Sequence, residues 1–136
     1  MTLQAEVDDA RRRVTVTAAG EVTGPAYVDW LMALLGSRPA LGGYDFIYDL
    51  QDYRGRVGHD DIAVLAGRYA ALVGEADRGA VTVLVTADEG FRFWAELFAV
   101  QFPNRIWRVA ATMAAAEAEL EEAARRRGNN APPPQP

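Results

Sequence analysis

The sequence predicts an α/β fold with the element order β-β-α-β-α-β-α-β-α. Two observations lead to this prediction. Along the chain, short segments of alternating or continuous apolar residues alternate with longer segments whose apolar residues recur at helical spacing. Glycine, proline and aspartate residues mark the boundaries between these segments. Because strands that alternate with helices pair mostly in parallel, we expect a mixed, mostly parallel sheet of about five strands packed with four helices.

The first half of the chain contains a predicted hairpin, a helix and a strand. Residues 3–7 and 14–17 alternate apolar and polar side chains around a polar turn, a pattern typical of two paired strands. A helix is expected to start at Pro25, because proline fits the first helical position, and to end near Gly36. The aromatic and β-branched run 44–50 predicts the third strand, followed by a polar loop.

The second half contains three predicted helices and two predicted strands. We expect helices from 60 or 61 to 73, over 91–102 and over 112–127, and strands over 80–86 and 105–109. The segment 80–86 is almost continuously apolar, as expected of a central strand covered on both faces. Gly128 is expected to end the last helix. One domain is therefore predicted over 1–127, with a disordered tail over 128–136.

Composition argues against several classes of function. The net charge of −5 disfavours nucleic-acid binding, because phosphate contacts need a concentrated basic surface. The chain has no cysteine and no lysine, one serine (Ser37) and one histidine (His59), so the usual nucleophilic and zinc sites lack their residues. We expect no cofactor and no metal. Without a membrane-spanning run or a secretory signal, a soluble cytoplasmic protein is expected.

Several segments together point to a known group of proteins. Residues 16–23 lead into the first helix, 46–50 end in Asp-Leu, 60–62 open the second helix, and 81–85 precede a closing strand and helix. In this order and spacing, over about residues 1–125, the chain resembles the STAS and SpoIIAA-like group, the anti-sigma-factor-antagonist fold, and its offshoot grouped with lipid-binding Sec14-type domains. The resemblance implies a non-enzymatic module that binds a protein partner or a hydrophobic small molecule.

One stretch departs from the pattern of this group. Its members carry an Asp-Ser-Ser-Gly-like motif at the start of the helix after the Asp-Leu strand, and phosphorylation of the serine breaks partner binding. Here the stretch 58–62 reads Gly-His-Asp-Asp-Ile and has no hydroxyl, which excludes a serine switch at this site. We interpret Asp60 and Asp61 as helix caps, with a permanent phosphate mimic as the alternative. His59 is interpreted as a loop residue that can titrate near neutral pH.

The predicted partner-binding or switch region joins the loop after the third strand to the start of the second helix. Its residues are Asp49, Asp52, Tyr53, Arg54, His59, Asp60 and Asp61. A divalent-cation site is a weaker alternative, since strand alternation gives Asp45 and Asp49 one face without bringing in Asp52, Asp60 and Asp61. An enzyme built on these carboxylates and His59 ranks last, because no recognisable motif supports it.

The helix over 91–102 has an apolar arc wider than burial against one sheet requires. At about 100° per residue, Phe91, Trp94 and Phe98 form one stripe, and Phe93, Leu97 and Val100 form the next. Core packing, a second subunit or a bound ligand would each account for this arc. We predict a hydrophobic pocket or interface made of Tyr27, Trp30, Phe91, Trp94 and Phe98.

These patterns lead to two functional predictions. The leading one is a STAS-like regulatory or protein-interaction module whose surface involves 51–60, the second helix and the helix over 91–102. Its partner would be another protein or a second copy of the chain. The alternative is a carrier or sensor of an apolar, lipid-like small molecule held under the helix over 91–102.

Overall fold

Six strands form one sheet in the computed structural model, which describes residues 1–129. The strands are β1 (Thr2–Asp8), β2 (Arg13–Thr23), β3 (Asp45–Asp49), β4 (Tyr53–Arg56), β5 (Val81–Val85) and β6 (Ile106–Ala110). Their order is β1-β2-β3-β5-β6, and β4 pairs with the far end of β2. Only β1 and β2 are antiparallel; the other pairings within residues 1–129 are parallel. The predicted mixed, mostly parallel sheet is confirmed.

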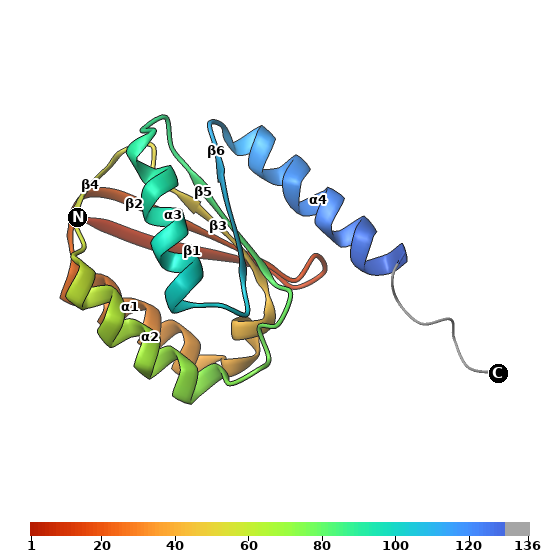
Figure 1. Cartoon of the computed structure of the whole chain (residues 1–136), viewed down its shortest axis with the longest axis horizontal. Coiled ribbons are helices and arrows are strands. Elements are labelled where there is room, and N and C mark those ends of the chain that lie inside the picture. The colour runs from red at the N-terminus through yellow and green to blue at the C-terminus, as the bar shows by residue number, and fades with distance from the viewer. Residues whose placement is uncertain (130–136) are drawn as a thin grey trace.

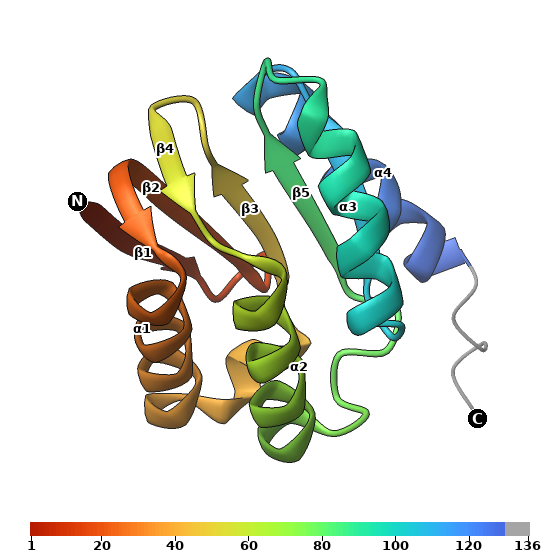
Figure 2. The same ribbon diagram turned by 60° about the vertical axis from the view of Figure 1, so that its left-hand side comes forward.

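The helices cover the two faces of this sheet unequally (Figure 1). They are α1 (Gly24–Ser37), α2 (His59–Val73), α3 (Gly90–Gln101) and α4 (Met113–Asn129), and a short 3-10 helix, η1 (Pro39–Gly43), follows α1. Figure 2 shows α1, α2 and α3 on one side of the strands and α4 behind them. Within residues 1–129, no helix is both long enough and apolar enough to cross a membrane.

Each face of the sheet has its own core. Val16, Tyr48 and Leu84 point to the face covered by α1, α2 and α3. The neighbouring residue Ile47 points to the opposite face, where it packs with Leu120 of α4. This follows from the period of two along a strand. β5 is buried at every position because helices cover both of its faces, as its continuous apolar run predicts.

The stretch after β3 differs from the prediction, because part of the expected loop is strand β4. β2 is longer than the predicted 14–17, and after pairing with β1 up to Ala19 it continues along β4. The change of partner occurs at Gly20, which has φ 73° and donates its N–H to the Asp52 carbonyl at 2.9 Å. Glycine adopts this backbone conformation at little cost.

The end of α4 also differs from the prediction. Gly128 does not end the helix, which continues to Asn129, so a tail beginning at 128 is wrong for its first two residues. Residues 130–136 of the predicted tail lie outside the described residues. An ion pair anchors the last turn: Arg127 contacts the buried Asp45 of β3 at 2.7 Å. At the other end, Thr112 accepts the N–H of Ala115 at 3.1 Å, as a capping residue does.

Candidate functional site: an aromatic pocket between α1, β4 and α3

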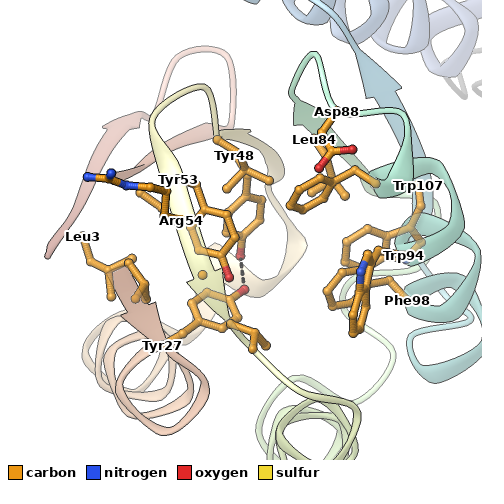
Figure 3. A pocket seen from close by; sticks show the side chains of 16 residues that line it. Leu3, Tyr27, Tyr48, Tyr53, Arg54, Leu84, Asp88, Trp94, Phe98 and Trp107 are labelled. Carbon is orange, nitrogen blue, oxygen red and sulfur yellow. Dashed lines mark hydrogen bonds between the residues drawn. The ribbon is translucent and has the colours of Figure 1, made fainter. Parts of the chain in front are cut away.

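A pocket of about 390 Å³ lies towards the carboxyl ends of β3 and β5, bordered by α1, β4 and α3 (Figure 3). Its lining is Leu3, Ala18, Val22, Tyr27, Tyr48, Leu50, Tyr53, Arg54, Gly55, Val57, Leu84, Asp88, Phe91, Trp94, Phe98 and Trp107. In open α/β sheets, ligands bind near the carboxyl ends of the strands. The pocket therefore has the position expected of a binding site in this architecture.

One wall of the pocket is a set of aromatic rings from α3 and β6. Phe98 stacks on Trp107, with ring centroids 5.0 Å apart and an angle of 14° between the planes. Trp94 lies next to Phe98, with ring centroids 6.4 Å apart. Residues 91, 94 and 98 share one side of a helix because they are three or four positions apart. This side of α3 faces the sheet and gives the pocket flat, apolar surfaces.

The other wall contains three tyrosines from three different elements. Tyr27 of α1 donates its hydroxyl to the hydroxyl of Tyr48 of β3 at 2.9 Å. Tyr53 of β4 contacts Phe91 edge-on, with centroids 6.1 Å apart. Figure 3 shows the hydroxyls of the three labelled tyrosines turned toward one another. Burial raises the pKa of Tyr27, Tyr48 and Tyr53 above the usual value near 10.0, so each stays protonated at neutral pH.

The buried tyrosines predict an alkaline limit to stability. Below pH 10 they are protonated in both the folded and the unfolded chain, so their contribution is fully present. Above pH 10.0, the ordinary tyrosine pKa, the unfolded chain releases protons that the folded chain retains, and folding becomes less favourable. We expect the free energy of unfolding to fall steadily above pH 10, and less steeply in Tyr48→Phe. Denaturant titrations and tyrosinate absorbance check this. Reversible ionisation of all five tyrosines near pH 10 in an intact fold would contradict it.

Four of the five residues predicted for the hydrophobic site lie around this pocket. Tyr27, Phe91, Trp94 and Phe98 are in its lining. Trp30 is not: it is half-buried on α1 and packs against the core beneath α1 and α2. Helical spacing places residues 27 and 30 on neighbouring parts of one helix face, and it does not show which of them reaches the sheet end where the pocket opens.

The residues predicted for the switch region do not form one cluster. Tyr53 and Arg54 belong to the pocket lining, and Figure 3 shows the Arg54 side chain directed away from the tyrosines. Asp49 is half-buried and accepts hydrogen bonds from the backbone and side-chain nitrogens of Gln51 at 3.2 and 3.0 Å. Asp52 is exposed in the turn before β4. These carboxylates therefore lie outside the pocket, in the turn between the two strands.

The three remaining switch residues form the first turn of α2. His59 and Asp60 are exposed. Asp61 accepts the Gly58 N–H at 2.8 Å, as a helix-capping carboxylate does. The same carboxylate lies beside Gly24 of α1, where an added Cβ would come within 1.8 Å of it. The contact made by Asp61 joins the starts of two helices, which agrees with the capping interpretation of this residue. The N-cap of α2 is Gly58 and not Asp60, and His59 is the first residue of the helix, so its interpretation as a loop residue is wrong.

The alternative of a divalent-cation site finds no support in the described part of the chain. Asp45 lies at the opposite end of β3 from Asp49 and is engaged by Arg127. Within residues 1–129, no three His, Cys, Asp or Glu side chains come close enough together to hold a metal ion.

Sequence reasoning missed two important members of the lining, Tyr48 and Trp107. Both lie on strands, on the face that also bears Phe46 and Val109. Strand alternation alone could assign each ring to a face. The strand order β3-β5-β6 was needed to bring that face against α3.

Comparisons with known proteins identify the fold. No protein-family model and no curated protein matches the chain. One similar solved structure is the anti-sigma factor antagonist SpoIIAA in its unphosphorylated form, with a TM-score of 0.58 and 16% identity over 88% of this chain and 98% of that one. Another is the phosphorylated form of SpoIIAA, a Bacillus cell fate determinant, with a TM-score of 0.53 and 19% identity over 88% and 99%. The chain has the SpoIIAA fold, and its predicted likeness to the STAS and SpoIIAA-like group is confirmed at the level of the fold.

Proposed function

We propose that this chain is a non-catalytic STAS-type binding module that holds an apolar aromatic small molecule between α1, β4 and α3. The observation that supports this most strongly is the convergence of aromatic side chains from α1, β3, β4, α3 and β6 on one pocket. Its volume, about 390 Å³, lies at the small end of the range of roughly 300–1,000 Å³ typical of ligand pockets. A mostly apolar lining with a few polar groups is also typical of such sites.

The lining supports recognition of a ligand and not its conversion. Besides tyrosines, its ionisable side chains are Arg54 and Asp88. Asp88 accepts the Gly90 N–H at 2.9 Å at the start of α3, so its carboxylate already has a structural role. His59 and Ser37 lie outside the lining. The pocket thus lacks the nucleophile and base pair that covalent catalysis requires.

Binding of the uncharged probe N-phenyl-1-naphthylamine tests this proposal. We expect saturable enhancement of its fluorescence by the native protein, because the pocket offers stacking surfaces shielded from water. Trp94→Ala removes one of these surfaces and is expected to weaken binding about tenfold or more. A fluorescence titration gives the dissociation constant for each variant.

Phe93→Ala is the matched control, since Phe93 lies on the same helix but is 65% exposed. It is expected to leave probe binding within about twofold of the native value, because the side chain is outside the pocket lining. Absence of saturable binding, or an equal loss in both variants, would show that the probe does not occupy this pocket.

A protein-interaction surface is the second candidate function. Phe93 and Val100 on the outer side of α3 are 65% and 75% exposed, which is unusual for large apolar side chains. Arg54, His59 and Asp60 are also exposed at β4 and the start of α2. Native mass spectrometry of freshly purified protein separates the two functions. A copurified small aromatic mass supports the pocket, whereas an empty dimer supports the interaction surface.

A further inference from the structure

The hydroxyl groups of the three tyrosines in the pocket lining indicate which chemical class of ligand the pocket accepts. We infer that the pocket selects an uncharged, planar aromatic molecule that carries a hydrogen-bond acceptor, such as a carbonyl oxygen, at the end facing Tyr27, Tyr48 and Tyr53. This inference rests on the proposed function and adds to it the requirement that the ligand carry a hydrogen-bond acceptor. A pocket that only shields apolar surface would not have this requirement.

The hydrogen-bond inventory of the tyrosines provides the first argument. A phenol has one proton to donate and two lone pairs to accept. Tyr27 donates its hydroxyl to the hydroxyl of Tyr48 at 2.9 Å, so this hydrogen bond does not use the Tyr48 proton. Among the described side chains of residues 1–129, Tyr48 accepts from Tyr27, Tyr53 has the backbone N–H of Val57 as a neighbour, and neither hydroxyl donates to a protein acceptor. An acceptor on the ligand would satisfy these donors in an otherwise apolar site.

The position of Tyr53 depends on the residue two places after it. A Cβ at Gly55 would lie 1.5 Å from both the hydroxyl oxygen and the ring carbon that bears it. The phenol ring therefore lies flat against the β4 backbone, where every residue except glycine would displace it. Glycine at this position allows the Tyr53 hydroxyl to join the other two.

The aromatic wall formed by α3 and β6 and the charged residues of the lining indicate the shape and the charge of the ligand. Phe98 and Trp107 stack on each other, and Trp94 lies beside Phe98, so this wall is an aromatic surface against which a planar ring system can pack. The two charged residues of the lining, Arg54 and Asp88, have opposite signs, and Arg54 is directed away from the tyrosines (Figure 3). Both of these side chains are exposed, so the pocket offers no buried charge to pair with a charged ligand, which favours an uncharged one.

A matched pair of probes tests the requirement for an acceptor. In 2-acetylnaphthalene a carbonyl oxygen stands where 2-isopropenylnaphthalene has a methylene group, and the two molecules otherwise have nearly the same shape. Displacement of N-phenyl-1-naphthylamine measures the affinity of each. We expect the ketone to bind about five- to tenfold more tightly, as one or two net hydrogen bonds provide.

Tyrosine-to-phenylalanine variants identify the groups responsible. Tyr48→Phe and Tyr53→Phe each remove a hydroxyl and keep the ring, so we expect the preference for the ketone to fall below about threefold with the hydrocarbon bound as before. Tyr53 is half-buried, so its variant keeps the test informative if Tyr48→Phe folds poorly. Tyr44→Phe is the control, because the Tyr44 hydroxyl donates to Asp9 at 2.8 Å, outside the pocket.

The outcomes distinguish this inference from the proposed function. Equal affinity for the two probes in the native protein overturns the inference and leaves the apolar pocket intact. An equal loss of preference in Tyr44→Phe and Tyr48→Phe also overturns it. If neither probe displaces the fluorophore, the proposed function fails as well. A ketone preference lost in Tyr48→Phe or Tyr53→Phe and kept in Tyr44→Phe supports it.

Discussion

Replacement of Arg105 by methionine is expected to lower the free energy of unfolding by about 3–5 kcal/mol. Arg105 is 7% exposed, and its guanidinium donates to the carbonyls of Gly42 and Tyr44 at 2.9 and 2.6 Å. It also donates to the hydroxyls of Thr82 and Tyr69 at 2.8 and 3.2 Å. Methionine fills the space but leaves these acceptors buried without a donor, which costs far more than the loss of an exposed hydrogen bond.

The surroundings of Arg105 explain why this effect should be large. Tyr69 donates its hydroxyl to the buried carboxylate of Asp77 at 2.7 Å, so the arginine, the phenol and the carboxylate form one chain that joins the residue before β6, α2 and the turn before β5. Burial raises the pKa of Tyr69 and keeps its proton in place for this role. Loss of the cation leaves the Asp77 charge without a positive neighbour in the same network.

Urea denaturation of the native protein and the variant measures this effect. Arg108→Met, on the strand that begins directly after Arg105, is the control, because Arg108 is exposed, and its change is expected to stay within about 0.5 kcal/mol. Arg105→Lys is expected to be destabilised as well, since an ammonium group cannot reproduce the planar fork of a guanidinium. A loss below about 1 kcal/mol in Arg105→Met would contradict the role assigned to this network.

Asp45→Ala is the second substitution with a large expected effect, about 2–3 kcal/mol of unfolding free energy. The carboxylate is 5% exposed, accepts the Val81 N–H at 2.9 Å and receives both terminal nitrogens of Arg127 at 3.0 and 2.7 Å. Alanine leaves a buried N–H of β5 unpaired and releases the last turn of α4. We therefore expect faster hydrogen exchange at the Val81 amide.

Asp49→Ala provides the matched control at the other end of β3. Asp49 is half-buried and accepts local hydrogen bonds from Gln51, so its removal is expected to cost about 1 kcal/mol or less. Equal losses in the two variants, or an unchanged exchange rate at Val81, would show that Asp45 does not anchor α4.

Local patterns in the sequence predicted most of the fold. The continuous apolar run of β5 and the helical spacing in α2 and α3 each follow from which faces must be buried. β4 escaped prediction because the polar segment Tyr53–Arg56 lacks apolar alternation and contains Gly55. Its strand character comes from pairing with the far end of β2, a partner distant in sequence. Such long-range pairing overrides local propensity.

The candidate site was predictable in part, for a related reason. The aromatic excess on α3 drew attention to this helix, and two of its rings, Trp94 and Phe98, are in the pocket lining. Tyr48 and Trp107 depend on which strands lie side by side. The positions of Trp30 and of the exposed Phe93 depend on how far each helix extends over the sheet. Strand order and the placement of the helices over the sheet are set by the tertiary structure, so they cannot be predicted from the spacing of residues along the chain.

The separate cores on the two faces of the sheet have a consequence for how this chain can change. Ile47 and Tyr48 are neighbours in β3, yet one packs with α4 and the other lines the pocket. The backbone of the sheet separates the two cores. A substitution on one face can therefore affect packing on the other face only by moving the backbone that both share. The shape of the pocket and the attachment of the last helix can therefore vary independently, even through substitutions at adjacent residues.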